Sequence, residues 1–508
     1  MRTWGQKTNR VMYRKSLRAS AGRELLGLIL PIGILTGLCF AAEWPQYRGP
    51  NGSGVGTASR LPTEFGPEKN VVWKIPVPFG HSSPVIAGDL IFITGGESTH
   101  SSVNSDHIAY QGKLYTLAIN RHTGKVVWRR EAPRNRVTGY QVNNSPATPS
   151  AVTDGKNVYV FFGDFGLLAY SKEGAERWRL PLGPLNNQNG VGSSPILYRD
   201  LLVLTCDQDN NDSYLLAVDK NTGRVRWKTP RPEVTRSYVT PAVYQPQHGP
   251  AELIVPGPLQ VTAYYTATGE KAWWVRGLWW QSKSVPVIDS DTIYAIAADT
   301  QGEEDSNKQK ELPTFAELLA KYDANHDAKL TIDEFSGDST MQKIAPGIDR
   351  DRKGFFDEHD WSIYRATMAA RNNLLAIRHG GQGDLTDTNV IWSMQKGLPS
   401  CTSPLIYQGV MYLVKNGGIL TTLDPKTGKI LKQGRLRGAL DEYYASPVAA
   451  AGKVFLLSQS GKATVVEAGA NWEILKVNDL EDDSYATPAI VDDRLYVRTR
   501  GTLYCFAD

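Results

Sequence analysis

Cysteine is scarce in this sequence. The 508 residues include only four cysteines, and Cys39 lies in the N-terminal segment, which leaves Cys206, Cys401 and Cys505 for the rest of the chain. These three are odd in number and far apart in the sequence. The pattern excludes a disulfide framework and a Cys-x-x-Cys metal site.

Net charge is nearly absent once the N-terminus is set aside. The whole chain carries +4, and residues 1–42 contribute +6 of it, because they hold seven Lys or Arg and one acid, Glu24. The remainder therefore carries about −2. No basic stripe remains that could follow a phosphate backbone, so we expect no nucleic-acid partner.

The segment 1–42 is interpreted as a signal peptide or membrane anchor, because a basic start is followed by an uncharged run from Leu25 to Ala42. Small residues near Ala41 would suit cleavage, and an uncleaved run would anchor the chain. Two further alternatives are a lipoprotein box at 36–39 and a misplaced start codon. Except in the last case, we expect an exported protein, periplasmic or extracellular, that meets a membrane only through an uncleaved or lipidated N-terminus.

A short sequence recurs along most of the chain. Ala118 to Arg129 reads A-I-N-R-H-T-G-K-V-V-W-R, a strand, a Thr-Gly turn and a second strand, with further copies at 217–227 and 263–273. Each copy is preceded by a proline that opens another hydrophobic strand: Pro84, Pro149, Pro195, Pro241, Pro286, Pro404, Pro447 and Pro488. The usual spacing is in the mid-forties, which is typical of a β-propeller blade of four strands. We predict an all-β fold, an eight-bladed β-propeller.

The two ends of the chain complement each other. The last unit, from Pro488, stops at Asp508 before its turn and Trp strand, whereas Asn70 to Ile75 is an unpaired strand with a Trp. We therefore expect the N-terminal strand to complete the last blade and close the ring. This gives an N-terminal arm at 43–69 and a propeller at 70–508.

The opening W-P-Q-Y-R-G-P-N-G-S-G at 44–54, followed by T-G-x-x-x-W repeats, resembles the pyrroloquinoline-quinone-like (PQQ-like) β-propeller repeat family of secreted bacterial proteins. That family includes quinoprotein alcohol dehydrogenases and the scaffold lipoprotein of the outer-membrane barrel assembly machinery. The resemblance implies the fold. It says little about function, because the repeated residues are structural.

The resemblance also implies what a quinone enzyme would need. Such enzymes place a catalytic Asp and a calcium-binding acid and Asn beside the quinone, commonly under a disulfide of adjacent cysteines. This chain has no adjacent cysteines, and no catalytic Asp can be aligned onto it.

Polar and aromatic residues fill the loops that precede the proline-marked strands. In a propeller these loops converge at one mouth of the central channel, where they would suit a polar ligand, a glycan or a peptide segment. The candidate ligand-binding residues are Tyr140, Asn143, Asn144, Asn189, Arg236, Tyr238, Trp280, Lys283, Asp441, Tyr444 and Tyr485.

Blade five is interrupted at 300–373 by a segment of a different kind. A helix predicted at 315–322 leads into D-A-N-H-D-A-K-L-T-I-D-E, which matches the twelve-residue calcium loop of an EF-hand. The predicted ligands are Asp323, Asn325, Asp327, Lys329 through its carbonyl, Thr331 and Glu334. Ala328 occupies the position where the pattern has Gly, so we expect a strained turn and a weaker site.

A second loop follows at 349–360, D-R-D-R-K-G-F-F-D-E-H-D. Its predicted ligands are Asp349, Asp351, Asp357 and Asp360. Lys353 stands at position 5 and Asp360 is short for position 12, so this loop reads as a weak or vestigial site.

These observations favour an exported, calcium-binding, non-enzymatic scaffold in the bacterial envelope, monomeric, with a protein or glycan partner on its loop-rich face. Two alternatives stay open. One is a PQQ-dependent dehydrogenase with the quinone in the channel, and the other is a carbohydrate-active enzyme that uses clustered acids such as Asp441 and Glu442.

Overall fold

The computed structural model describes residues 43–299 and 312–508. The fold is a β-propeller, as predicted. Its first four sheets contain β2 (Val85–Ala87), β3 (Leu90–Gly96), β6 (Leu114–Asn120) and β7 (Val126–Ala132); β9 (Val152–Thr153), β10 (Asn157–Phe162), β11 (Gly166–Ser171) and β12 (Glu176–Pro181); β13 (Ile196–Tyr198), β14 (Leu201–Cys206), β15 (Tyr214–Asp219) and β16 (Val225–Pro230); and β17 (Ala242–Tyr244), β18 (Glu252–Pro256), β19 (Gln260–Tyr265) and β20 (Lys271–Arg276).

The remaining four sheets continue in the same order and end with the closing strand. They contain β21 (Val287–Asp289), β22 (Thr292–Ala297), β25 (Asn373–Arg378) and β27 (Val390–Met394); β28 (Leu405–Tyr407), β29 (Val410–Lys415), β30 (Ile419–Leu423) and β31 (Ile430–Arg435); β32 (Val448–Ala450), β33 (Lys453–Leu457), β34 (Lys462–Glu467) and β35 (Ile474–Asp479); and β36 (Ala489–Val491), β37 (Arg494–Arg498), β38 (Thr502–Phe506) and β1 (Val71–Pro76).

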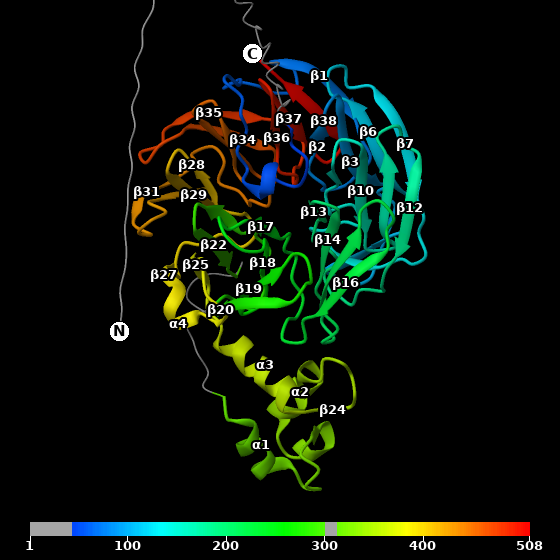
Figure 1. Ribbon diagram of the computed structural model, residues 1–508, viewed down its shortest axis with the longest axis vertical. Coiled ribbons are helices and arrows are strands. Elements are labelled where there is room, and N and C mark those ends of the chain that lie inside the picture. Colours follow the sequence, from blue (N-terminus) through cyan, green and yellow to red (C-terminus); the bar gives the residue numbers. More distant parts are fainter. Residues whose placement is uncertain (1–42, 300–311) are drawn as a thin grey trace, which may run out of the picture. The chain divides into compact units, whose positions relative to one another are not determined.

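These eight sheets are antiparallel, and their number within the described residues equals that of the repeated units. The first strand of each sheet lies near the centre of the ring and the fourth on its outside, as β2 and β7 show (Figure 1). β1 pairs with β38, which confirms the predicted closure by the two ends of the chain. The all-β prediction is therefore correct, and the ring leaves no unpaired end.

The repeated Thr-Gly turn and Trp hold neighbouring sheets together. The indole N–H of Trp178 donates to the carbonyl of Lys220 at 2.8 Å, and a Cβ on Gly223 would lie 2.7 Å from the same ring. Gly223 has a φ of 72°, so only Gly suits both the backbone and the contact. Four other Trp side chains make the same bond to the next turn: Trp73, Trp128, Trp227 and Trp392.

A belt of buried hydroxyls links the innermost strands. The N–H of Ser83 donates to Ser150 Oγ at 2.9 Å, and the N–H of Thr487 donates to Ser83 Oγ at 2.9 Å, which joins the last sheet to the first. Five equivalent bonds join Ser150 to Ser194, Ser194 to Thr240, Val285 to Ser403, Ser403 to Ser446 and Ser446 to Thr487. The belt shows that Ser150, one residue after the proline marker at 149, is the true equivalent of Ser83.

The N-terminal arm crosses the ring of innermost strands, around the short helix η1 (Pro50–Gly52). Trp44 pairs with Ile86 of β2, and the amide of Asn51 exchanges two 2.8 Å hydrogen bonds with Val243 of β17. Gly54 accepts from the N–H of Ala449 in β32 at 2.9 Å. The arm therefore touches blades on several sides of the channel and helps to fix the ring.

Short strands and a short helix are added to the four-stranded sheets of the propeller. β4 (His100–Ser102) and β5 (His107–Tyr110), from the long loop of the first blade, pair with each other, and β5 also pairs with β8 (Gly139–Gln141). β26 (Gly383–Asp384) adds a parallel fifth strand to β20 and precedes α4 (Thr386–Asn389). No helix within 43–299 and 312–508 is long and apolar enough to cross a bilayer. The predicted leader at 1–42 lies outside the described residues.

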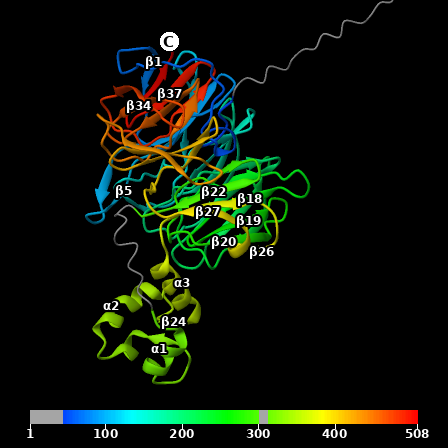
Figure 2. The ribbon, with the colours of Figure 1, turned by 90° about the vertical axis from the view of Figure 1, so that its left-hand side faces the viewer.

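Helices are found where the sequence predicts an insertion, between β22 and β25. They are α1 (Phe315–Tyr322), η2 (Ile332–Phe335), α2 (Ser339–Ile348) and α3 (Glu358–Ala369), together with the paired strands β23 (Leu330–Thr331) and β24 (Phe355–Phe356). Figure 2 shows the three α-helices gathered around β24. We call residues 312–371 the helical lobe. Its core includes Phe335, Phe356 and Trp361, all buried.

Candidate functional site

A cavity of about 470 Å³ lies where the loops before the innermost strands converge. Its lining includes members of the hydroxyl belt, such as Ser83 and Ser194, and Tyr47 of the N-terminal arm. We call it the channel pocket. Seven of the predicted ligand-binding residues line it: Asn143, Asn144, Asn189, Tyr238, Lys283, Tyr444 and Tyr485.

One wall of the channel pocket is aromatic. The rings of His81 and Tyr485 stack with centroids 4.2 Å apart, and Tyr444 packs against Tyr485 at 5.1 Å. The hydroxyl of Tyr444 donates to Glu442 Oε2 at 2.7 Å and accepts from the amide of Asn143 at 3.0 Å. Burial, with the bond to Glu442, raises the pKa of Tyr444, so its phenol stays protonated and available as a hydrogen-bonding group.

The opposite side of the pocket is rich in amides. Asn144 donates to the carbonyl of Asn189 at 2.8 Å and accepts from Thr148 Oγ1 at 2.6 Å, so it braces two loops. Tyr238 donates to Asn187 Oδ1 at 3.2 Å. A lining of phenols and amides can both donate and accept hydrogen bonds, which suits an uncharged polar group.

Formal charge is sparse in the pocket. Of the described residues that line it, Lys283 is the cation, with Nζ 3.0 Å from Ser400 Oγ, and Glu442 is the acid. Burial lowers the pKa of His81 to about 3, helped by the charges of Arg498 and Arg500. The imidazole is therefore neutral at physiological pH.

Four predicted residues do not line the pocket. Tyr140 is fully buried and donates to Asp164 Oδ1 at 3.1 Å, so it stabilises its own loop. Asp441 accepts from the N–H groups of Glu442 and Ser460, both at 2.8 Å, and shapes its own loop.

The other two, Arg236 and Trp280, contact each other. The Arg236 guanidinium lies 5.5 Å from the centroid of the Trp280 ring and makes an ion pair of 3.3 Å with Asp209. The ion pair with Asp209 balances the charge of Arg236 without a ligand. Neither Arg236 nor Trp280 lines the pocket.

Sequence reasoning missed several lining residues. Tyr47 lies within the W-P-Q-Y-R-G-P opening, and His81 stands three residues before a proline marker, so both had a signal in the sequence. Gln141, Gln281, Cys401, Asn416 and Glu442 also line the pocket. They lie in or beside the loops that the sequence singles out.

The first loop of the helical lobe has the backbone that the calcium pattern predicts. The carboxylate of Asp323 accepts from the N–H groups of Asp327 at 3.2 Å and Ala328 at 3.1 Å. Ala328 has a φ of 58°, the conformation for which Gly is usual, so the strained turn is present. Glu334 Oε2 accepts from the N–H of Thr331 at 2.8 Å.

No group of three or more His, Cys, Asp or Glu in the described residues is arranged to hold a metal ion. In the first loop the carboxylates of Asp323 and Glu334 accept hydrogen bonds from backbone N–H groups. Asn325, Lys329 and Thr331 lie in the same loop as predicted. Calcium binding there stays a prediction.

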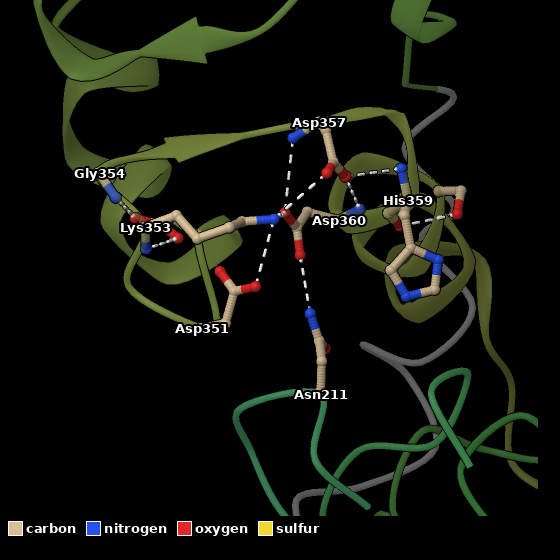
Figure 3. Close-up of polar contacts among 9 residues, drawn as sticks. Asn211, Asp351, Lys353, Gly354, Asp357, His359 and Asp360 are labelled. Carbon is tan, nitrogen blue, oxygen red and sulfur yellow. Dashed lines mark hydrogen bonds and ion pairs between the residues drawn. The ribbon is translucent and has the colours of Figure 1, made fainter. Parts of the chain in front are cut away.

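The second loop differs because a cationic side chain lies inside it. Lys353 Nζ lies 3.2 Å from carboxylate oxygens of both Asp351 and Asp357, and 3.4 Å from one of Asp360 (Figure 3). Asp349 accepts from the N–H groups of Lys353 and Gly354 instead. Three of the four predicted ligands therefore surround an ammonium group.

The charges of the described pocket lining bear on the PQQ alternative. PQQ is a tricarboxylate, whereas the described lining offers one cation, Lys283, and adds an acid, Glu442. The neutral His81 does not change this balance.

Fold and pocket together define a β-propeller whose channel holds a polar, mostly uncharged cavity. The family model described as outer membrane protein assembly factor BamB matches residues 113–310 and 366–508, and the chain belongs to that family. The stretch between the two matched parts contains most of the helical lobe, residues 312–365.

A solved structure agrees on the fold. The crystal structure of BamB from Moraxella catarrhalis is similar over 86% of this chain and 99% of its own, with 11% identity and a TM-score of 0.51. A europium-containing methanol dehydrogenase covers 92% of this chain and 98% of its own, with 11% identity and a TM-score of 0.43. No curated protein matches the sequence of the chain.

Proposed function

We propose that the protein is an exported, non-enzymatic binding scaffold of the bacterial cell envelope, and that its channel pocket receives an extended polar segment of a protein partner. The observation that carries the proposal is the lining of the pocket. Tyr, Asn, Gln and Ser dominate it, and Tyr, Asn and Ser are enriched in the antigen-binding loops of antibodies. The family name, an assembly factor of outer-membrane proteins, supports an envelope partner.

One of the two acids named for the carbohydrate-active alternative is poorly suited to catalysis. Partial burial raises the pKa of Asp441, but its bonds to Ser460 and to backbone N–H groups outweigh that effect and lower the pKa, so Asp441 is ionised. It also lies outside the pocket lining. A carboxylate in that state is a poor proton donor to a leaving group.

Tyr444→Ala is expected to weaken partner binding at least about tenfold, because it removes an aromatic face and a hydroxyl that orients Asn143. The probe is an array of extended segments from envelope proteins, with affinities of retained peptides measured by fluorescence polarisation. The matched control is Tyr198→Ala, at the end of β13. Retention of glycans alone, or equal affinities for Tyr444→Ala and wild type, would refute the proposal.

We further propose that the first loop of the helical lobe binds one calcium ion. Glu334→Gln is expected to weaken calcium binding roughly 100-fold, because affinity in such loops follows the number of charged ligands and Glu334 stands at the bidentate position. Calorimetric titration of the full exported chain with calcium measures this. Equal affinities for Glu334→Gln and wild type would contradict the assignment.

A further inference from the structure

The two loops of the helical lobe share one backbone design. In each, the carboxylate at position 1 accepts from the N–H groups of positions 5 and 6: Asp323 in the first loop, Asp349 in the second. In each, positions 4 and 6 have positive φ: 62° and 58° at His326 and Ala328, and 58° and 88° at Arg352 and Gly354. The second loop is therefore folded as a cation-binding loop.

The loops differ at position 5, where Asp327 in the first corresponds to Lys353 in the second. The Lys353 side chain folds back into its own loop, where Nζ lies between the carboxylates of positions 3, 9 and 12, which are Asp351, Asp357 and Asp360 (Figure 3). An ammonium group has three N–H donors, and three carboxylates face it.

Burial shows that one of these acids, Asp360, needs a cation. The Asp360 side chain is 0% exposed, and a buried carboxylate without a counter-charge is strongly destabilising. Lys353 is itself two-thirds covered, at 33% exposure. The lysine thus provides the charge that a metal ion would otherwise supply.

Asp360 also connects the lobe to the propeller. Its Oδ1 accepts from the amide of Asn211 at 3.0 Å, and Asn211 lies in the loop between β14 and β15 (Figure 3). Asp360 therefore contacts Lys353 within the lobe and Asn211 of the propeller.

We propose that the Lys353 ammonium is the resident cation of the second loop, so that this loop is ordered and tied to Asn211 without calcium and the lobe takes a single calcium ion, in its first loop. The single calcium rests on the proposed function. The role of Lys353 rests on the second loop alone.

The resident cation also prepares the first loop. β23 and β24 join the two loops through Leu330 opposite Phe356 and Thr331 opposite Phe355. Because the second loop is already ordered, its strand β24 is in place before calcium binds to the first loop. Pre-ordering lowers the free-energy cost of ion binding in the first loop.

The lysine is tested directly by its reactivity. Acetylation of the calcium-free full chain with an amine-reactive ester, followed by mass spectrometry, compares Lys353 with Lys329, an exposed lysine of the first loop. Lys353 is expected to react at least about tenfold more slowly, and Asp351→Asn is expected to speed up its reaction. Equal rates for the two lysines, or no effect of Asp351→Asn, would overturn the proposal.

The number of calcium ions is tested by calorimetric titration. Wild type is expected to bind one ion, and Glu334→Gln is expected to bind it roughly 100-fold more weakly. If Glu334→Gln retains a site that Asp351→Asn then removes, the second loop binds calcium and the lysine proposal is wrong. If wild type binds none, the proposed calcium function fails, while the acetylation result still decides the role of Lys353.

Discussion

Replacing Asp207 with asparagine is expected to lower the free energy of unfolding by about 3–5 kcal/mol. Asp207 and Arg231 are both 0% exposed and form an ion pair of 2.7 Å. The second carboxylate oxygen accepts from Ser237 Oγ at 2.5 Å. Asparagine keeps the size of the side chain but leaves the guanidinium buried without a counter-charge, and chemical denaturation would measure the loss.

The double variant Asp207→Leu/Arg231→Met is the control for this prediction. It removes both charges and is expected to lose less stability than Asp207→Asn alone, because no buried charge remains unpaired. A single variant as stable as wild type would show that the pair contributes little. The pair matters for the pocket as well, since Ser237 directly precedes Tyr238, which lines it.

The Asp207–Arg231 pair also bears on whether the loop that contains Asp207 can bind a cation. The loop at 207–212 is acidic, but its carboxylates and the side-chain N–H groups of Asn210 and Asn211 already have partners, whereas the side-chain oxygens of these two Asn residues have none among the described residues. Asp207 pairs with Arg231, Asp209 with Arg236, and the Asn211 amide with Asp360. A separate cation site in this loop would have to displace these contacts.

The fold could be predicted from the sequence because its marks are local. A Gly that must adopt positive φ and a Trp that must contact the next turn recur with the period of a blade, as Gly223 and Trp178 show. The unpaired strand at 71–76 was likewise visible as half of a repeat. The hydroxyl belt was not predicted, because each of its bonds joins residues of different repeats, as between Ser83 and Thr487.

The sequence could predict which loops form the pocket, but not which of their residues line it. A polar residue that faces a cavity and one that holds its own loop in place look the same in the sequence. Asn143 and Asp441 both stand in polar loops before a marked strand. The first lines the pocket, whereas the second bonds to the N–H groups of its own loop and of Ser460. That difference depends on where a neighbouring loop places its backbone.

The metal loops show a similar limit. Ligand spacing predicted the left-handed turn at Ala328. It also marked Lys353 as a departure from the pattern. It could not show that the lysine side chain turns inward to the carboxylates, since a long flexible side chain at that position could equally extend into solvent.

Acid is expected to destabilise the propeller through His81. Its pKa is about 3 in the folded protein, because burial and the charges of Arg498 and Arg500 oppose protonation, against about 6.5 in the unfolded chain. As pH falls below 6.5, His81 becomes protonated in the unfolded chain but stays neutral in the folded protein. Stability is therefore lost until about pH 3, where the folded protein also takes up the proton. By pH 4 the loss amounts to about 3 kcal/mol relative to pH 7.

His81→Phe separates this effect from that of the carboxylates. Phenylalanine keeps the stacking on Tyr485 but has no titrating group, so the free energy of unfolding of the variant should fall less steeply between pH 6.5 and 4. Denaturation at several pH values measures the two curves, and parallel curves would show that His81 does not titrate differently in the folded protein. Because the imidazole stays neutral in the folded pocket, a partner meets it as an aromatic surface at physiological pH. Partner binding should therefore be less sensitive to His81→Phe than to Tyr444→Ala, which removes a hydroxyl as well as a ring.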